Sequence, residues 1–529
     1  MAELDHLDKF FIQLDEPSLS IDLSKMSLSE GWLEPLLPAL SQALEAMKEL
    51  EAGSIANADE KRMVGHYWLR NSTLAPTKEI STQIENSITQ VEQFSEKILT
   101  GEIASKGGKF KNVLIAGIGG SALGPQLLSD CFWDLNPKSL NFYFCDNTDP
   151  DGISRTLEKL KNELAQTLVF VVSKSGGTRE TFNASKEIEH AYTAQSLKFA
   201  DSAVAITLEG SKLDQRAKNE DWLKTFYVWD WVGGRTSINS TVGLLPLALL
   251  GGNIREFLAG AASMDQLSRS ASSAENPAAL LAASWFVAGN GQGEKSLVVL
   301  PYKDRLLLTG RYLQQLVMES LGKKLNRSGK DVFQGISVFG NKGSTDQHAY
   351  IQQLRDGKND FVANFIQVLQ DKKDISSPSL EITPGITSGD YLQGFLLGTS
   401  QALSESKRQS YLITLDKLTE KSLGALLALY ERAVGLYAEL VDVNAYNQPG
   451  VEAGKKAANK VLEIQEAIQK QLLTKDTAEF TAEELAVEIG IKPQSETVYW
   501  ILEHLAQNER GLKKIAQAKP SKTQYKVER

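Results

Sequence analysis

A short polar loop with the side chains that bind a phosphate lies between an apolar run and a helix-like segment. The loop spans residues 173–178 and follows the apolar run 168–172, which is typical of a buried strand. Its two glycines let the backbone fold closely around a ligand, and the start of the following helix offers free N–H groups. Hydroxyl groups come from Ser173, Ser175 and Thr178. We therefore predict a site for a phosphate monoester, with an ordinary polar turn as the alternative, since similar loops recur without ligands.

A second glycine-rich loop follows another predicted strand, at residues 113–116. This loop, residues 117–122, fits the dinucleotide-binding pattern glycine-x-glycine-x-x-small, and Asp146 follows a plausible next strand. A nicotinamide-dependent enzyme is therefore an alternative, although the pattern alone is common. Gly120 and Ser121 suit a contact with a second anion or a sugar equally well. Open sheets bind ligands at the carboxyl ends of their strands, where both loops are expected to lie.

Two charged residues further along the chain could take part in a proton transfer. One could stabilise a developing negative charge, and the other could accept the proton. Arg235 follows Gly233 and Gly234, so the backbone can approach a ligand while the guanidinium stabilises a developing oxyanion. Glu319 follows three apolar residues, and a carboxylate beside apolar side chains can act as a general base near neutral pH. The alternatives are a surface arginine on a turn and an ordinary glutamate on a helix.

Two further candidates are a histidine and a lysine. His348 ends the loop after the predicted strand 335–339 and could act as an acid or base; a solvent-facing loop histidine is the alternative. Lys455 follows a helix break at Pro449 and Gly450. Helix starts favour acidic residues, so a lysine there suggests an anionic ligand, with a solvated lysine as the alternative. We treat the other histidines as structural or solvent-facing: His6, His66, His190 and His504.

The composition is that of a globular protein with a full core. Hydrophobic residues make up 42% of the 529 residues, and the net charge of −9 argues against a nucleic-acid binder. Two cysteines and five scattered histidines argue against a disulfide framework or a zinc cluster. The first residues lack a signal-peptide pattern, and the most apolar run, 242–250, is too short to span a bilayer. We expect a cytoplasmic protein with no membrane partner.

Hydrophobic periodicity predicts helices at both ends of the chain and two α/β blocks between them. The first hundred residues are predicted to be helical, with an amphipathic helix at 80–99. Alternating apolar runs and helical patterns then predict a mostly parallel sheet covered on both faces. A second such block begins near residue 275, with a helix at 306–325; long helices follow at 423–471, and the tail after Pro520 is expected to fray. The predicted strands are 113–116, 141–144, 168–172, 202–206, 226–229, 296–300, 335–339 and 361–368.

Taken in order, these motifs resemble the phosphoglucose isomerase family. The resemblance implies an α/β fold: two doubly wound, mostly parallel-sheet, phosphosugar-binding (SIS-type) domains with helical N- and C-terminal additions. The expected division is a helical N-terminal region at 1–100, SIS-type domains at 101–270 and 271–440, and a helical C-terminal region at 441–529. The motifs that carry the resemblance are 117–125, 173–181, 233–237, 318–323, 346–348 and 444–455.

The resemblance also implies a reaction, the reversible conversion of glucose 6-phosphate to fructose 6-phosphate in glycolysis and gluconeogenesis, without metal or cofactor. Glu319 would move the proton between C1 and C2 through a cis-enediol, with Arg235 stabilising its charge. His348 and Lys455 would assist ring opening, and a homodimer would supply the histidine across its interface. Substrate contacts would come from Gly120, Ser121, Ser173, Lys174 through its backbone, Ser175, Thr178, Gly234, Gln315 and Gln448.

Two other functions remain open at this point. A non-catalytic phosphosugar-binding regulator would need the loop 173–178 but not the proton-transfer groups together. A nicotinamide-dependent oxidoreductase would rest on the loop 117–122 alone. The chain departs from the family pattern at several positions that would shape the sugar pocket: Thr236, Asn239, Leu321 and 344–346.

Overall fold

The computed structural model describes residues 3–135, 139–270, 272–372, 376, 378–475, 479–515 and 519–528. Within the helix that begins at Pro449, only the backbone is described at 451–453, 455 and 456. The chain divides into two compact units, Met1–Asn447 and Gln448–Arg529.

The first sheet of the larger unit is wholly parallel and confirms the predicted α/β fold. Its order is β4-β3-β5-β6-β7, so the chain moves outward from β3 first to one side and then to the other. This reversal places a switch point between β3 and β5, where the carboxyl ends of two neighbouring strands leave room for a ligand. The strands are β3 (Asn112–Ala116), β4 (Asn141–Cys145), β5 (Thr167–Val172), β6 (Ala203–Leu208) and β7 (Lys224–Val228).

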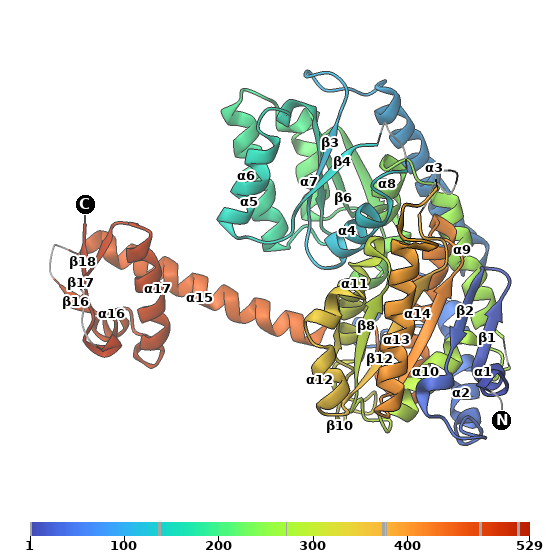
Figure 1. The fold of residues 1–529 in the computed structure, drawn as a ribbon. Coiled ribbons are helices and arrows are strands. Elements are labelled where there is room, and N and C mark those ends of the chain that lie inside the picture. Colours follow the sequence, from blue (N-terminus) through green and yellow to red (C-terminus); the bar gives the residue numbers. More distant parts are fainter. Residues whose placement is uncertain are drawn as a thin grey trace. The chain divides into compact units, whose positions relative to one another are not determined.

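Helices cover both faces of this sheet (Figure 1). Successive strand residues point to opposite faces. Ile115 therefore joins one hydrophobic core and Leu114 another. The helices α3 (Lys78–Thr100), α4 (Gly120–Phe132) and α8 (Thr241–Leu249) pack on the first face, and α5 (Pro150–Leu160), α6 (Arg179–Ala194) and α7 (Lys212–Asn219) pack on the second. The predicted amphipathic helix at 80–99 is confirmed as part of α3.

The second sheet repeats the parallel arrangement and adds two antiparallel strands from the N-terminus. Its order is β1-β2-β15-β12-β8-β11, with a switch point between β8 and β12. The helical prediction for residues 1–100 is wrong at β1 and β2, and β15 was not predicted. β1 and β2 have only four residues each, too few to show a clear periodicity, and the pairing of β2 with the distant β15 decides their place in the sheet. The strands are β1 (Phe11–Leu14), β2 (Leu19–Asp22), β8 (Ser296–Pro301), β11 (Val338–Phe339), β12 (Phe361–Val368) and β15 (Ser410–Leu415).

Helices also enclose the second sheet. Leu297 belongs to the core shared with the first sheet, whereas Val298 belongs to a separate cluster on the other face. The helices on the shared side are α2 (Leu37–Glu51), α9 (Ile254–Ser268), α10 (Pro277–Ala288) and α14 (Glu420–Leu440); those on the other are α12 (Ile351–Asp356) and α13 (Ser388–Glu405). This unit also contains α1 (Glu3–Phe10) and a small hairpin of β13 (Glu381–Thr383) and β14 (Ile386–Thr387).

The continuous helix predicted at 306–325 is wrong. The chain instead forms α11 (Thr309–Leu313), then a π-helical turn η8 (Gln314–Glu319), and then β9 (Lys323–Leu325), which pairs with β10 (Asp331–Gln334). Gly322 lies at the end of the helix, where an added Cβ would lie 2.6 Å from the carbonyl oxygen of Met318. π-turns inside α-helices are frequent at functional sites, and this one carries Glu319 at its last position.

The smaller unit has its own core of helices and a three-stranded sheet. Its elements are α15 (Pro449–Thr474), β16 (Phe480–Thr481), α16 (Ala482–Glu488), α17 (Ser495–Gln507), β17 (Leu512–Ile515) and β18 (Gln524–Val527). The expectation of a frayed tail after Pro520 is wrong, because β18 pairs with β16 and β17 and buries Tyr525. Among the described residues, no helix is long and apolar enough to cross a membrane.

Candidate active site

The two glycine loops at 117–122 and 233–237 meet beside the carboxyl end of β3. Gly119 has a positive φ of 58°, which favours glycine. A Cβ on Gly120 would overlap the carbonyl oxygen of Gly234, so the two backbones approach as closely as glycine permits. Ser237 donates to the carbonyl of Gly120 at 3.2 Å. The predicted Gly120 and Gly234 contacts thus belong to one wall of a site.

The predicted phosphate loop follows β5, next to β3, and is ordered by its own side chains. The Ser173 hydroxyl accepts the N–H of Gly176 at 3.1 Å and donates to the Thr178 hydroxyl at 3.2 Å. The Ser175 hydroxyl, on an exposed residue, accepts the N–H of Gly177 at 3.1 Å. α6 begins directly after Thr178, so its N-terminal N–H groups and dipole face the loop. This is the helix-start arrangement that binds anions.

Lys174 turns its side chain away from the loop. Its ammonium donates to the carbonyls of Asp230 at 3.2 Å and Val232 at 3.0 Å, just before Gly234. Burial lowers the pKa of Lys174 to about 8. The side chain therefore ties the phosphate loop to the loop that carries Arg235, a role that the sequence did not reveal.

Glu319 and Arg235 face each other in the interior of this site. The Nε of Arg235 lies 3.4 Å from Oε2 of Glu319, and that buried carboxylate oxygen has no hydrogen-bond partner among the residues that the structure describes. Arg235, which is 5% exposed, donates to the carbonyls of Ala445 at 3.2 Å and Asn447 at 3.0 Å. It also donates to the hydroxyl of Ser320 at 3.3 Å. Burial lowers the pKa of Arg235, but a guanidinium stays charged at neutral pH.

Gln315 lies on the same π-turn as Glu319 and borders the first glycine loop. Its Nε2 would lie 3.1 Å from a Cβ at Gly119, so the amide lies close against this glycine. Ser121, in the first turn of α4, is partly exposed at the same end of β3. The structure therefore brings the predicted residues of the first sheet and the π-turn together around one site.

His348 stands apart from this group. It ends the short helix η9 (Thr345–His348) and is exposed, and no hydrogen bond or ion pair joins it to Glu319 or Arg235 in the described part of the chain. The neighbouring Gln347 donates to the carbonyl of Phe395 at 3.1 Å, which attaches η9 to α13. Within this single chain, His348 thus faces outward.

Gln448 and Lys455 belong to the smaller unit, at the start of α15. Gln448 is the residue before the helix, and Pro449 occupies its first turn. Their roles toward the substrate stay predictions.

A buried network of charged side chains, which the sequence did not predict, contacts the main chain of Arg235 through Tyr312. Tyr312 donates to Oε1 of Glu431 at 2.8 Å and lies 3.4 Å from the carbonyl of Arg235. Arg70 also bonds Glu431, and Nε2 of His66 lies 3.9 Å from that carboxylate. Burial and the nearby arginines hold the pKa of His66 well below its usual range. Sequence reasoning missed this cluster because its members come from distant segments.

The positions that depart from the family pattern lie mostly in the interior. Leu321 is fully buried in the main core, and Thr236 and Asn239 are 7% and 2% exposed. Leu321 therefore contributes to packing.

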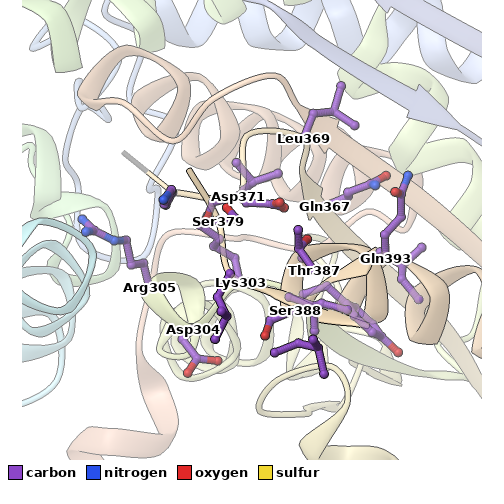
Figure 2. A pocket seen from close by; sticks show the side chains of 18 of the residues that line it. Lys303, Asp304, Arg305, Gln367, Leu369, Asp371, Ser379, Thr387, Ser388 and Gln393 are labelled. Atoms are coloured by element: carbon purple, nitrogen blue, oxygen red, sulfur yellow. The ribbon is translucent and has the colours of Figure 1, made fainter. Parts of the chain in front are cut away.

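The second sheet has a cavity of about 650 Å³ at its own switch point, between the ends of β8 and β12 (Figure 2). A Cβ on Gly389 would overlap the carboxylate of Asp371, so that carboxylate lies against the start of α13. The helix start that corresponds to the phosphate loop is thus occupied by the chain's own anion. Two other charged side chains of the lining are paired: Asp304 with Lys342 at 3.0 Å, and Arg305 with Asp134. These contacts favour the first sheet as the substrate site.

No group of three or more histidine, cysteine, aspartate or glutamate side chains that could hold a metal ion occurs within the described ranges. The residues gathered at the first sheet are donors suited to a phosphate and a sugar, and a carboxylate–guanidinium pair suited to proton transfer.

Comparison with known proteins agrees with this geometry. The family model described as phosphoglucose isomerase matches residues 22–383 and 399–479. A glucose-6-phosphate isomerase of Trichormus variabilis is 54% identical over 495 residues, covering 93% of each chain. One from Thermosynechococcus vestitus is 52% identical over 531 residues, covering 100% of this chain and 99% of the relative.

Solved structures give the same result for the fold. The crystal structure of a glucose-6-phosphate isomerase from Chlamydia trachomatis superposes with a TM-score of 0.79 at 26% identity, covering 87% of this chain and 91% of that one. A hypothetical protein from Thermus thermophilus superposes with a TM-score of 0.67 at 27% identity, covering 81% of this chain and 95% of that one. The chain belongs to the phosphoglucose isomerase family.

Proposed function

We propose that this protein interconverts glucose 6-phosphate and fructose 6-phosphate by a proton transfer through Glu319. The observation that carries the proposal is the buried carboxylate oxygen of Glu319 beside the guanidinium of Arg235, 3.4 Å away. This oxygen, which has no hydrogen-bond donor in the described part of the chain, is available to accept a proton from carbon. An aldose–ketose interconversion leaves the overall oxidation state unchanged, so proton movements complete it.

The chemical step follows from this pair. Glu319 removes the proton from C2 of the open-chain aldose, and the electrons of that C–H bond form the C1–C2 double bond of a cis-enediol. The carbonyl oxygen at C1 gains negative charge, which Arg235 stabilises in a site of low dielectric constant. The proton of the C2 hydroxyl is transferred to the oxygen at C1, Glu319 returns its proton to C1, and the carbonyl forms at C2. Because Arg235 is held by three acceptors, it needs little reorganisation during the step.

The loop 173–178 binds the phosphate group of the substrate and is called the phosphate handle below. Its hydroxyls and the N-terminal N–H groups of α6 bind the phosphate and so position C1 and C2. Gly120, Ser121, Gly234 and Gln315 line the path between the handle and the base. We further propose that Gln448 contacts the substrate and that Lys455 assists ring opening.

The decisive test replaces the base by its isosteric amide. Glu319→Gln keeps the size of the side chain and removes its ability to accept a proton, so we expect turnover in a coupled glucose 6-phosphate assay to fall at least about 10³-fold. Circular dichroism and binding of a substrate analogue would verify the fold and the handle. Near-normal turnover by this variant would refute the mechanism. If the chain were instead a non-catalytic regulator of the same domain type, the unchanged protein would bind sugar phosphate but show no turnover.

We propose further that two copies of the chain form the active enzyme and exchange His348. Several exposed apolar side chains lie on α13 and on or next to the β13–β14 hairpin, and α13 contacts η9, so a second copy packed here would remove them from water. The side chains concerned are Leu380, Ile382, Ile386, Tyr391, Phe395 and Leu397, which are 40–78% exposed. His348 lies at the end of η9, so a partner covering α13 would receive it.

Complementation between two inactive variants tests the exchange. His348→Ala and Glu319→Gln would be mixed, dissociated and reassembled. If the histidine acts across the interface, mixed dimers regain one intact site, and activity returns to about a quarter of the normal value. If the histidine acts within its own chain, mixing restores nothing. Light scattering would report the oligomeric state independently.

We place the enzyme in the cytoplasm. Cys131 and Cys145 are both free and buried, as expected for a protein of a reducing compartment.

A further inference from the structure

Lys323 lies four residues after the proposed base, Glu319, and its side chain has two main-chain hydrogen-bond partners. Its ammonium donates to the carbonyl of Glu319 at 2.9 Å and to the carbonyl of Asn447 at 2.9 Å. The residue is 6% exposed, and no carboxylate of the described residues forms an ion pair with it. A buried ammonium held by carbonyls alone is unusual, because burying a charge is costly. It therefore calls for a functional explanation.

The first partner is explained by the end of the helix. The π-turn ends at Glu319, whose carbonyl is among those left without a helical N–H partner. Gly322 lets the chain reverse, since a Cβ there would lie 2.6 Å from the carbonyl of Met318. The side chain of Lys323 then folds back by four residues to cap Glu319. A cation at a helix C-terminus also interacts favourably with the helix dipole.

The second partner connects the base to the oxyanion group. Arg235 donates to the same carbonyl of Asn447, at 3.0 Å. Lys323 and Arg235 therefore donate to the same oxygen atom. Of the two, Lys323 also donates to the main-chain carbonyl of Glu319. The relative position of Glu319 and Arg235 thus depends on this shared acceptor.

Asn447 is fixed from its other side, so it can serve as an anchor. Its side chain donates to the carboxylate of Asp59. Asn444 donates to the same carboxylate at 2.8 Å. Asn57 donates to the carbonyl of Tyr446 at 3.3 Å. The segment 444–447 is irregular but held at each of these points.

We propose that Lys323 is a positioning residue for the proton transfer: its ammonium ties the carbonyls of Glu319 and Asn447 and so holds the Glu319 carboxylate against Arg235. The inference rests on the proposed function. A base displaced by about 1 Å can lose roughly 10²-fold in rate, so a clamp of this kind acts on kcat.

The charge of this clamp is sensitive to alkaline pH. Burial and the charge of Arg235 lower the pKa of Lys323 to about 8, against the opposing effects of Glu319, Asp59 and Glu60. Below that pH the ammonium makes two charge-assisted hydrogen bonds; above it the neutral amine makes weaker ones. The clamp therefore loosens as the pH rises through 8, and kcat falls with it.

The test compares three variants of the full chain. Lys323→Met removes the donors and keeps an apolar stem; Lys323→Arg keeps a charge that does not titrate in this range. Lys324→Met is the matched control, because Lys324 is the neighbouring residue but is exposed, with its ammonium 3.8 Å from the carboxylate of Asp331. kcat and KM for fructose 6-phosphate would be measured from pH 6 to pH 10, with the unchanged protein as reference.

We expect Lys323→Met to lower kcat about 10- to 100-fold while KM changes less than about twofold. Lys323→Arg should recover part of kcat and move the alkaline decline to higher pH, and Lys324→Met should match the reference. A normal kcat in Lys323→Met, or an effect confined to KM, would overturn the proposal. If Lys323→Met does not fold, the pH profile of Lys323→Arg decides, and an unmoved decline overturns the proposal. Failure of the proposed function would appear differently, as an inactive reference protein or an active Glu319→Gln.

Discussion

Arg235 holds its guanidinium 3.4 Å from the carboxylate of Glu319, although the two residues belong to different α/β halves of the larger unit. Arg235 follows the last strand of the first sheet, and Glu319 follows the first strand of the second. The proposed base and the group proposed to stabilise the developing charge thus meet where the two halves pack together. Both side chains are largely withdrawn from water, which strengthens their effect on a reacting sugar.

Replacing Arg235 by lysine should lower kcat about 10²- to 10³-fold with a small change in KM. A lysine keeps the charge but cannot reach Ser320, Ala445 and Asn447 with one planar group. Steady-state kinetics of Arg235→Lys would measure the effect, and circular dichroism would verify the fold. A lysine variant with an unchanged kcat would show that charge alone suffices.

Gly120→Ala should inactivate the enzyme or prevent stable folding. The added Cβ would overlap the carbonyl oxygen of Gly234, and neither backbone can move without displacing Arg235 or the start of α4. Gly152→Ala in α5 is the matched control, because its Cβ would meet Asp149 only at an ordinary 3.5 Å. Activity and the melting temperature of both variants would be compared. Equal behaviour of the two alanine variants would contradict the close approach.

Ser173→Ala should raise KM for glucose 6-phosphate about tenfold, because the loop loses a hydroxyl that orders Gly176 and Thr178. The effect on kcat should be smaller, since the phosphate lies away from the reacting carbons. Inhibition by inorganic phosphate should weaken in parallel. Ser263→Ala, on the outside of α9, serves as the control because its hydroxyl donates to the carbonyl of Ala259 within its own helix. An unchanged KM and an unchanged phosphate affinity would show that this loop does not bind the phosphate.

The free energy of unfolding should fall as the pH drops below about 6.5, partly through His66. The pKa of His66 is lowered in the folded state, so the unfolded chain binds the proton more readily. The neutral form therefore stabilises the fold above the unfolded pKa, and each further pH unit of acidification costs up to about 1.4 kcal/mol.

Urea unfolding between pH 5 and pH 7.5 would measure this dependence, with His66→Gln for comparison. The variant should show a shallower pH dependence, whatever its absolute stability. The same slope in both proteins would assign the acid sensitivity to other groups.

The sequence alone determined the local chemistry of this protein. Alternating apolar runs and helical patterns predicted two α/β blocks, because strand and helix periods are local properties. The hydroxyl and glycine loop at 173–178 and the pair Gly233 and Gly234 before Arg235 were recognisable for the same reason. Together with Glu319, they indicated a phosphate site, an oxyanion partner and a general base, and the resemblance of all the motifs to a family implied the sugar phosphate and the reaction.

Only the tertiary structure decided how these groups meet. The 3.4 Å approach of Arg235 to Glu319, the shared acceptor Asn447 and the two strands that the N-terminus adds to the second sheet all join residues far apart in the chain. The roles of Lys174 and Lys323 also emerged there, since a lysine in a sequence does not reveal which carbonyls its ammonium will reach. Hydrophobic packing of the two sheets fixes these distances, and no local pattern encodes them.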